Sequence, residues 1–385
     1  MAVAMSRVRA ALMLHRAVPQ PQQCLLASLQ LARTLVCKAV ETPPAAETPP
    51  EAEKNTENKL LLDNLKVLGV DVPMARKRQP GVLRRTETNE HGLVTFLKAK
   101  GADRETVASI ISRFPRAITR SRQHLEERWQ LWRSVFQSDQ EVVSILHRSP
   151  ESFFRSSDND NLEKNIVFLS SLGLDSRDLH RLLTTAPRTF SNSVELNRQM
   201  VELLQDICHT LGGTQPSKFA KAVISKNLYI LIRSTKRVEA NVKFFREALG
   251  LRDSLLLAFL QGSGADILDM SHDILRRNFR MLQEKLTSVG GSKKDSITII
   301  VNYASVLYLS PERLSEKVDC LLREGISVGQ IVQKPKVLDF SLENLKWRMD
   351  ELRKLHYDFG INGITVLDTS KKRFEAKLIK LSALE

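Results

Sequence analysis

The strings SPESFF (149–154), APRTF (186–190) and KPKVL (334–338) decide the fold of this 385-residue chain. Each has a proline at its centre and apolar side chains within the next four residues. The same pattern recurs along the chain, with a proline or a substitute at the centre and 31 to 41 residues between successive centres. A period of this length is typical of helical-repeat proteins. The centres are Pro80, Pro115, Pro150, Pro187, Leu228, Gly264, Ala304 and Pro335.

Two further signals frame each centre and predict a pair of helices in every repeat. Upstream, a glycine follows an apolar stretch and can take the left-handed conformation that closes a helix. These glycines are Gly69, Gly101, Gly173, Gly212, Gly250, Gly290 and Gly325. Downstream, a serine lies six residues after most centres, and serine is a preferred N-cap. These serines are Ser121, Ser156, Ser193, Ser234, Ser310 and Ser341, with Ser271 one place later in its repeat.

The repeats predict an all-α fold for residues 60–385, because the alternating pattern of strands is nearly absent. A unit of this length cannot bury both of its helices alone, so about eight to nine units should stack into a curved solenoid with a basic concave groove. With helices about 8–10 Å apart, such an arc measures about 70–90 Å. That length corresponds to about 20–25 base pairs of duplex DNA.

The N-terminal segments have a different composition from the repeats. Residues 1–40 contain no acidic residue but five basic ones, which is typical of a mitochondrial transit peptide. A disordered basic tail is the alternative interpretation. Residues 41–59 contain four prolines and five glutamates without an apolar period, so we expect a disordered linker.

The charge of the chain points to a polyanionic partner. Its 58 basic and 44 acidic side chains give a net charge of +14. Residues 1–59 account for seven of the basic and five of the acidic groups, which leaves +12 on residues 60–385. The positive charge therefore belongs mainly to the predicted repeats, and nucleic acid is the first partner to consider.

Several classes of protein find no support in the sequence. The longest apolar run, Leu255 to Leu260, is far shorter than the roughly 20 residues of a membrane-spanning helix. The four cysteines form no CxxC pair, the histidines form no HExxH motif, and no phosphate-binding loop or nucleophile motif occurs. We therefore expect no enzyme activity, no metal or other cofactor, no small-molecule substrate and no membrane partner.

Basic residues recur at fixed positions beside the predicted turns. Arg120, Arg155 and Arg233 lie five residues after a centre, and Arg116, Arg188 and Lys336 lie one residue after a centre. A helix N-terminus with its unpaired amide groups favours anions, so a row of capped helices flanked by cations would fit a row of phosphates. Charges on an ordinary solvated helix face are the alternative for any single arginine.

Longer strings resemble the mitochondrial transcription termination factor family over nearly the whole chain after residue 60. They are MARKRQPGV (74–82), SPESFFRS (149–156), APRTFSNS (186–193), STKRVEAN (234–241) and SKKRFEAKL (370–378). The resemblance implies a monomer whose repeats each contain two α-helices and a short 3-10 helix. It implies binding to double-stranded mitochondrial DNA in the matrix nucleoid, at a site in the leucine tRNA gene downstream of the rRNA genes. There the family member bends and unwinds the duplex, everts bases and blocks the mitochondrial RNA polymerase. An influence on the initiation of rRNA transcription stays open.

The resemblance also assigns roles to residues of this chain. It implies base reading by Arg155, Arg188, Arg237 and Arg373. Lys336 stands where the family has arginine and offers a point charge instead of a planar fork. With the capping serines and neighbouring cations, the predicted DNA-binding set is Arg155, Ser156, Arg188, Arg233, Ser234, Thr235, Lys236, Arg237, Ser310, Lys336, Ser341, Ser370, Lys371, Lys372 and Arg373.

Three positions correspond to the residues that stack on everted bases: Arg148, Tyr229 and Ile274. Ile274 replaces a tyrosine and lacks a ring to stack, and Asp266 replaces a glutamate near the bases. Periodicity alone makes Tyr229 as good a core aromatic as a base platform. The same periodicity predicts that Trp129, Trp132, Phe153 and Phe154 belong to the core.

Two other functions remain open on the sequence alone. A mitochondrial rRNA-binding or ribosome-assembly factor could use the same repeats, and should prefer single strands or A-form geometry. A protein-binding scaffold should instead show an apolar or aromatic groove. The recurring arginines favour DNA.

Overall fold

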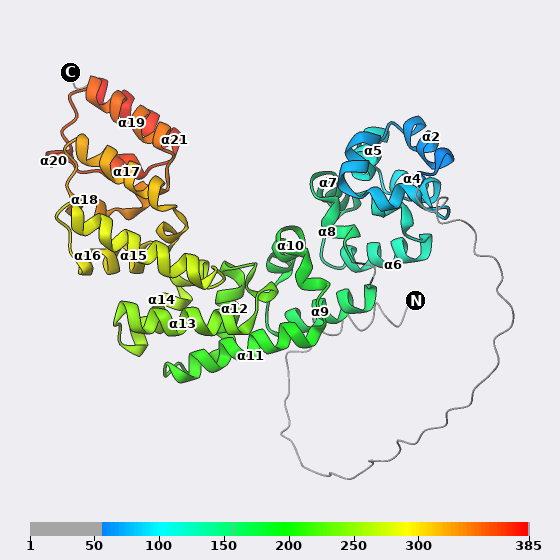
Figure 1. Cartoon of the computed structure of the whole chain (residues 1–385), viewed down its shortest axis with the longest axis horizontal. Helices are drawn as coiled ribbons and strands as arrows, with labels where there is room; N and C mark the ends of the chain where they lie inside the picture. Colours follow the sequence, from blue (N-terminus) through cyan, green and yellow to red (C-terminus); the bar gives the residue numbers. More distant parts are fainter. Residues whose placement is uncertain (1–55, 157, 384–385) are drawn as a thin grey trace, which may run out of the picture. The chain divides into compact units, whose positions relative to one another are not determined.

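The regular structure of the chain is helical throughout the part that is described. The computed structural model describes residues 56–156 and 158–383, and no strand occurs among them. This confirms the predicted all-α class (Figure 1). The predicted transit peptide (1–40) and most of the predicted linker (41–59) lie outside the described residues. The first described helix begins at Lys59 and is capped by the side chain of Asn58.

The chain forms two compact units that divide after Asn159, so the predicted domain 60–385 contains unit 2 and residues 60–159 of unit 1. In unit 1, α-helices alternate with short 3-10 helices, labelled η. The elements of unit 1 are α2 (Lys59–Val67), α3 (Val72–Arg78), η2 (Pro80–Arg84), α4 (Glu90–Ala99), α5 (Arg104–Arg113), η3 (Pro115–Thr119), α6 (Arg122–Arg133), α7 (Asp139–Arg148) and α8 (Pro150–Phe154).

Unit 2 continues the same alternation from α9, which begins at the division between the units. Its elements are α9 (Asn159–Ser171), α10 (Ser176–Thr185), η4 (Pro187–Phe190), α11 (Val194–Thr210), α12 (Pro216–Lys226), η5 (Ile230–Ile232), α13 (Thr235–Leu249), α14 (Asp253–Gln261), η6 (Ser263–Ile267), α15 (His272–Ser288), α16 (Lys293–Asn302), η7 (Ala304–Tyr308), α17 (Pro311–Arg323), α18 (Val328–Gln333), η8 (Pro335–Asp339), α19 (Leu342–Lys354), α20 (Phe359–Asn362), η9 (Thr365–Asp368) and α21 (Lys371–Ser382).

Every predicted centre lies in or beside a short helical turn between the two long helices of its repeat. Proline opens four of the 3-10 helices, where its fixed φ suits the first position. At Pro150 the turn is the α-helical α8 and not the 3-10 helix that the resemblance implies. A further turn, η9, with the sequence TVLD, was not among the predicted centres.

The helix ends follow the predicted pattern with one exception. All seven predicted glycines have positive φ values. Ser121, Ser310 and Ser341 accept a backbone hydrogen bond as N-caps, and three more predicted serines occupy the N-cap position without that bond. The N-cap prediction for Ser156 is wrong, because α9 begins three residues later. The preceding residue, Arg155, still has helical angles after α8, which delays the turn.

The core of each unit is built from the apolar stripes of the helices. Trp129, Trp132, Phe153 and Phe154 are fully buried in unit 1, as predicted. The ring of Phe153 lies 5.9 Å from Trp129 and 5.1 Å from Trp132, in edge-to-face geometry. In unit 2, Cys208 and Cys320 are buried among apolar residues.

A buried polar side chain on the first helix of most repeats ties that helix to the next turn. Asn241 donates to the carbonyl oxygens of Leu268 (3.0 Å) and Met270 (2.9 Å). Asn241 lies seven residues after a capping serine. The side chains at the same position of other repeats are Arg128, Asn278, Lys317 and Arg348, and each donates to a carbonyl of the following turn. The polar residues therefore fix the position of the turns relative to the helices.

Replacing Asn278 by alanine should lower the free energy of unfolding by about 1–3 kcal/mol, because one buried and one partly buried carbonyl lose their donor. Its Nδ2 atom lies 2.8 Å from the oxygen of Leu307 and 3.1 Å from that of Leu309. Urea unfolding followed by circular dichroism measures the change. Asn302→Ala, at an exposed helix end, is the control and should stay within about 0.5 kcal/mol of the wild type. Equal losses for both variants would contradict the proposed tie.

Candidate nucleic-acid interface

The turns of unit 2 form a row along one edge of that unit. η4 packs against η5, and η6, η7, η8 and η9 pack against one another in order. Asn227 Nδ2 connects the two groups through the oxygen of Ala265 at 2.9 Å. The helices α11, α13, α15, α17 and α19 lie side by side in the same order (Figure 1). Because α13, α15, α17, α19 and α21 each begin directly after a turn, their N-termini reach this edge. We call the turns η4–η9 and these first helical residues the turn row.

Many predicted DNA-binding residues lie on the turn row. Arg188 is exposed in η4, and Lys336 is exposed in η8. Ser234 to Arg237 begin α13, and Ser370 to Arg373 begin α21. Ser310 and Ser341 cap α17 and α19. Amide groups and cations are therefore repeated along one edge, which is the arrangement that binds successive anions.

Some of these cations are free to meet a ligand. Arg188, Lys236 and Lys372 make no side-chain hydrogen bond or ion pair with any residue that the structure describes, and all three are exposed. Their charges face water. They can approach a phosphate without first leaving another partner.

Other cations of the turn row are held by carboxylates. Arg233 pairs with Asp269 at 3.1 Å, Lys336 with Asp368 at 3.8 Å, and Lys371 with Glu375 at 3.9 Å. A phosphate must compete with these carboxylates. The row is thus a mixture of free and paired cations, with the acidic groups Asp266, Asp269, Asp339 and Asp368 among them.

The candidates of unit 1 lie at the ends of its short helices. Arg148 ends α7 and is exposed, and Arg155 follows α8 and pairs with Glu151. Ser156 Oγ accepts from the amide of Asp158 at 3.0 Å. Arg120 is half-buried, donates to the oxygen of Phe154 at 2.9 Å, and has a pKa lowered by burial. Arg120 therefore holds a turn in place.

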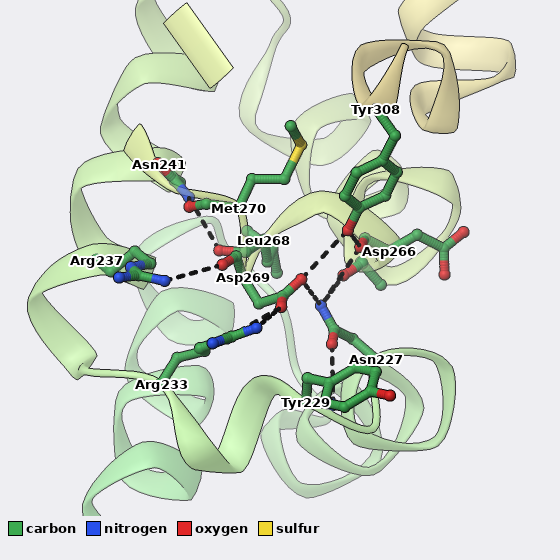
Figure 2. Close-up of polar contacts among 11 residues, drawn as sticks. Asn227, Tyr229, Arg233, Arg237, Asn241, Asp266, Leu268, Asp269, Met270 and Tyr308 are labelled. Atoms are coloured by element: carbon green, nitrogen blue, oxygen red, sulfur yellow. Dashed lines mark hydrogen bonds and ion pairs between the residues drawn. The ribbon is translucent and has the colours of Figure 1, made fainter. Parts of the chain in front are cut away.

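Of the three predicted stacking residues, two lie in unit 2 with exposed side chains. Tyr229 is 43% exposed, which excludes the alternative of a core aromatic, and Ile274 in the first turn of α15 is 42% exposed. Tyr229 lies beside Arg233 and Arg237 in one cluster around Asp269 (Figure 2). The third residue, Arg148, belongs to unit 1.

Asp269 is the centre of this cluster and was missed in the sequence. Its carboxylate accepts hydrogen bonds from Asn227 Nδ2 (3.0 Å), Arg233 Nε (3.1 Å) and the hydroxyl of Tyr308 (3.3 Å), as Figure 2 shows. Its backbone oxygen lies 3.4 Å from Arg237 Nη1. The sequence held a signal, because Asp269 lies five residues after a centre, where other repeats have Arg120, Arg155 or Arg233.

Burial and nearby carboxylates raise the pKa of three groups along the turn row. Partial burial raises the pKa of Asp266, although Lys226 opposes the shift. Burial, then the charge of Asp269 and its hydrogen bond, raise the pKa of Tyr308. Burial and a hydrogen bond to Asp339 raise the pKa of Tyr303. Both tyrosine hydroxyls therefore remain protonated donors at neutral pH.

A hollow of about 340 Å³ lies at the C-terminal end of the turn row. It brings the predicted residues Ser341 and Lys371 together with Trp347, which the sequence did not single out. Glu343 and Asn344 complete its lining. The hollow joins a capped helix start, a cation and an aromatic ring.

The described residues contain no group of three or more His, Cys, Asp or Glu side chains that could hold a metal ion. Over the same residues, no helix is both long enough and apolar enough to cross a membrane.

Comparison with known proteins gives a consistent result. The mTERF family model matches residues 62–375. Transcription termination factor 1, mitochondrial, from Homo sapiens is 51% identical over 326 residues, which cover 85% of this chain and 82% of that protein. The protein of the same name from Rattus norvegicus is 49% identical over 329 residues, covering 86% and 88%. Transcription termination factor 2, mitochondrial, from Homo sapiens is 28% identical over 380 residues, covering 96% of each chain.

Proposed function

Because this chain belongs to the mTERF family, we propose that it is a mitochondrial DNA-binding protein that terminates transcription. The names of the relatives state both transcription termination and the mitochondrion. Their similarity extends over most of this chain, and the match to the family model includes the turn row. The chain acts by occupying DNA, and we propose no catalytic step.

The finer proposal concerns the site and the manner of binding. The protein binds as a monomer in the leucine tRNA gene downstream of the rRNA genes, bends and unwinds the duplex, and everts bases. The bound protein then blocks the mitochondrial RNA polymerase. The motifs around Arg188, Arg237 and Arg373 support this proposal, since they match the family strings that imply base reading.

The observation that carries the proposal is the turn row of unit 2. It combines two anion-binding features: helix N-termini at the spacing of adjacent helices, and cations in η4, in η8 and at the starts of α13 and α21. Helix N-termini bind phosphates through free amide groups and the helix dipole. Contacts of this kind set the register of a protein on a duplex, while side chains such as Arg188 can read base edges.

Protection mapping on fragments of the mitochondrial genome tests the proposal. We expect one strongly protected segment in the leucine tRNA gene, and arrest of the mitochondrial RNA polymerase at its border. Protection that is evenly spread over the genome would contradict sequence-specific termination. Tight binding to rRNA without a protected DNA segment would instead favour the ribosome-assembly function.

Replacing Arg188 by alanine should weaken binding to the protected segment by about 1–3 kcal/mol and leave random duplex nearly unaffected. Arg188 is exposed and has no side-chain partner among the described residues, so its loss disturbs no internal contact. Fluorescence anisotropy on the two duplexes measures the ratio of affinities.

Arg280→Ala is the matched control for Arg188. This substitution removes the same charge as Arg188→Ala. Arg280 lies on α15, two turns of helix after the turn row, and its side chain is 69% exposed. It should change both affinities only slightly. Equal losses on the protected and the random duplex for Arg188→Ala would argue against base reading by Arg188.

A further inference from the structure

Tyr308 is the most exposed aromatic side chain in the part of the chain that the structure describes, at 54%. It ends η7, in the middle of the turn row. It lies within the repeat motif centred on Ala304, but the family resemblance implies no role for it. Exposure of an apolar ring to water is unfavourable, so we ask which ligand could cover the ring of Tyr308 at this predicted nucleic-acid interface.

The side chain of Tyr308 is held at both ends. Its hydroxyl donates to the backbone oxygen of Asp266 at 2.6 Å and lies 3.3 Å from the carboxylate of Asp269. Its backbone is fixed by Asn278, which donates to the carbonyls of the residues on either side, Leu307 and Leu309. The ring therefore loses little conformational entropy when a ligand packs on it, which favours binding.

Tyr308 shares its anchor with Tyr229. Asn227 Nδ2 donates to the same oxygen of Asp269 at 3.0 Å, and Asn227 Oδ1 accepts from the amide of Tyr229 at 3.2 Å. Figure 2 shows Tyr308 joined to this network through its ring hydroxyl and Tyr229 joined to it through its backbone amide. One buried carboxylate, in the repeat centred on Gly264, thus links two exposed aromatic residues from the repeats before and after it.

Tyr308 also lies near a position at which this sequence lacks an expected aromatic ring. Ile274 on α15 stands where the family pattern has a ring, and an isoleucine offers no π face for stacking. α15 packs directly against η7, which carries Tyr308. An aromatic surface is therefore present in the neighbourhood where Ile274 lacks one.

We propose that Tyr308 is a second platform in unit 2, beside Tyr229, on which an extrahelical nucleobase stacks. The ligand class is any base that has left the duplex, because stacking uses the π face that all bases share. Asp269 and Asn278 act as positioning residues for the ring. The proposal rests on the proposed DNA-binding function and adds a contact to it.

The experiment uses the full chain and two synthetic DNA duplexes of about 30 base pairs, a length that exceeds the predicted contact. They have the same arbitrary sequence, and one carries a single bulged adenine, which is already unpaired and costs less to extrude. Tyr308→Ala should weaken binding to the bulged duplex about tenfold and change binding to the paired duplex less than about twofold. Tyr308→Phe should remain within about threefold of the wild type on both duplexes.

Tyr357→Ala is the matched control. The hydroxyl of Tyr357 also bonds to turn carbonyls, those of Asn362 and Gly363, but this residue follows the C-terminal end of α19. It should leave the preference for the bulge intact. A direct readout replaces the bulged base by 5-iodouracil, which should crosslink to the peptide that contains Tyr308 under ultraviolet light.

Three kinds of outcome would overturn the proposal. If Tyr308→Phe loses as much binding as Tyr308→Ala, the hydroxyl anchor matters and the ring face does not. If Tyr308→Ala weakens both duplexes equally, or if the crosslink forms only elsewhere, Tyr308 does not stack on the extruded base. If the wild type binds neither duplex at low salt, the proposed DNA-binding function fails together with the role of Tyr308. The earlier outcomes contradict only the role of Tyr308, because the wild type still binds DNA.

Discussion

Raising the salt concentration from about 50 to about 200 mM should weaken binding to duplex DNA by about a thousandfold. The turn row meets the DNA backbone with charges and helix N-termini, and each neutralised phosphate releases a condensed counterion. A protein with about six to ten such contacts loses about 10³- to 10⁵-fold over this range. Free cations such as Lys236 and Lys372 contribute directly.

The salt titration also separates free from paired cations. Lys372→Ala should reduce the slope of log affinity against log salt by about one, because it removes one phosphate contact. Lys371→Ala should reduce the slope less, since Lys371 already lies 3.9 Å from Glu375. Anisotropy at five or six salt concentrations gives both slopes. A wild-type slope near zero would mean that binding does not rest on phosphate contacts.

Replacing Arg348 by alanine should lower the free energy of unfolding by about 3–5 kcal/mol. Arg348 is 1% exposed, and its Nη1 donates to the carbonyls of Leu367 (3.0 Å) and Thr369 (2.7 Å). Its guanidinium also lies between the rings of Phe340 and Phe374, at 4.4 and 4.7 Å from their centres. The variant leaves unsatisfied carbonyls and a cavity between two rings.

Two further variants make the Arg348 prediction specific. Arg348→Lys should lose less than the alanine variant, because Lys317 holds the corresponding turn of the previous repeat through the carbonyl of Leu338 at 2.7 Å. Arg353→Ala, on the exposed side of the same helix, should cost less than about 1 kcal/mol. Urea unfolding measures all three. An alanine variant as stable as Arg353→Ala would contradict the role of Arg348 in fixing η9 and α21.

The repeat architecture was predictable because its signals are local. Proline before a 3-10 turn, glycine after a helix and serine before the next helix act through the backbone of their own neighbours. Two helix predictions failed, one where the sequence pattern of the turn was weak and one where the backbone of the preceding residue delayed the next helix. η9 has no proline at its start, and the helical angles of Arg155 delay the start of α9 beyond Ser156.

The candidate site was predictable only in its cations. The sequence places arginines at fixed positions of the repeat, but it does not show which of them are paired. The pair of Arg233 with Asp269 joins residues 36 positions apart, in the turns of successive repeats. Exposure of Tyr229 and Tyr308 likewise depends on how those turns pack. The predicted basic groove remains a prediction, since the turn row contains both signs of charge.

One measurement tests most directly whether this chain binds double-stranded DNA through its turns. The segment found by protection mapping is prepared as DNA duplex, RNA duplex and single-stranded DNA, and affinity is measured for each as salt is raised. We expect tight binding with a steep salt dependence for the DNA duplex alone, and weak binding to the other two. Equal or tighter binding to either RNA duplex or single strand would contradict the account.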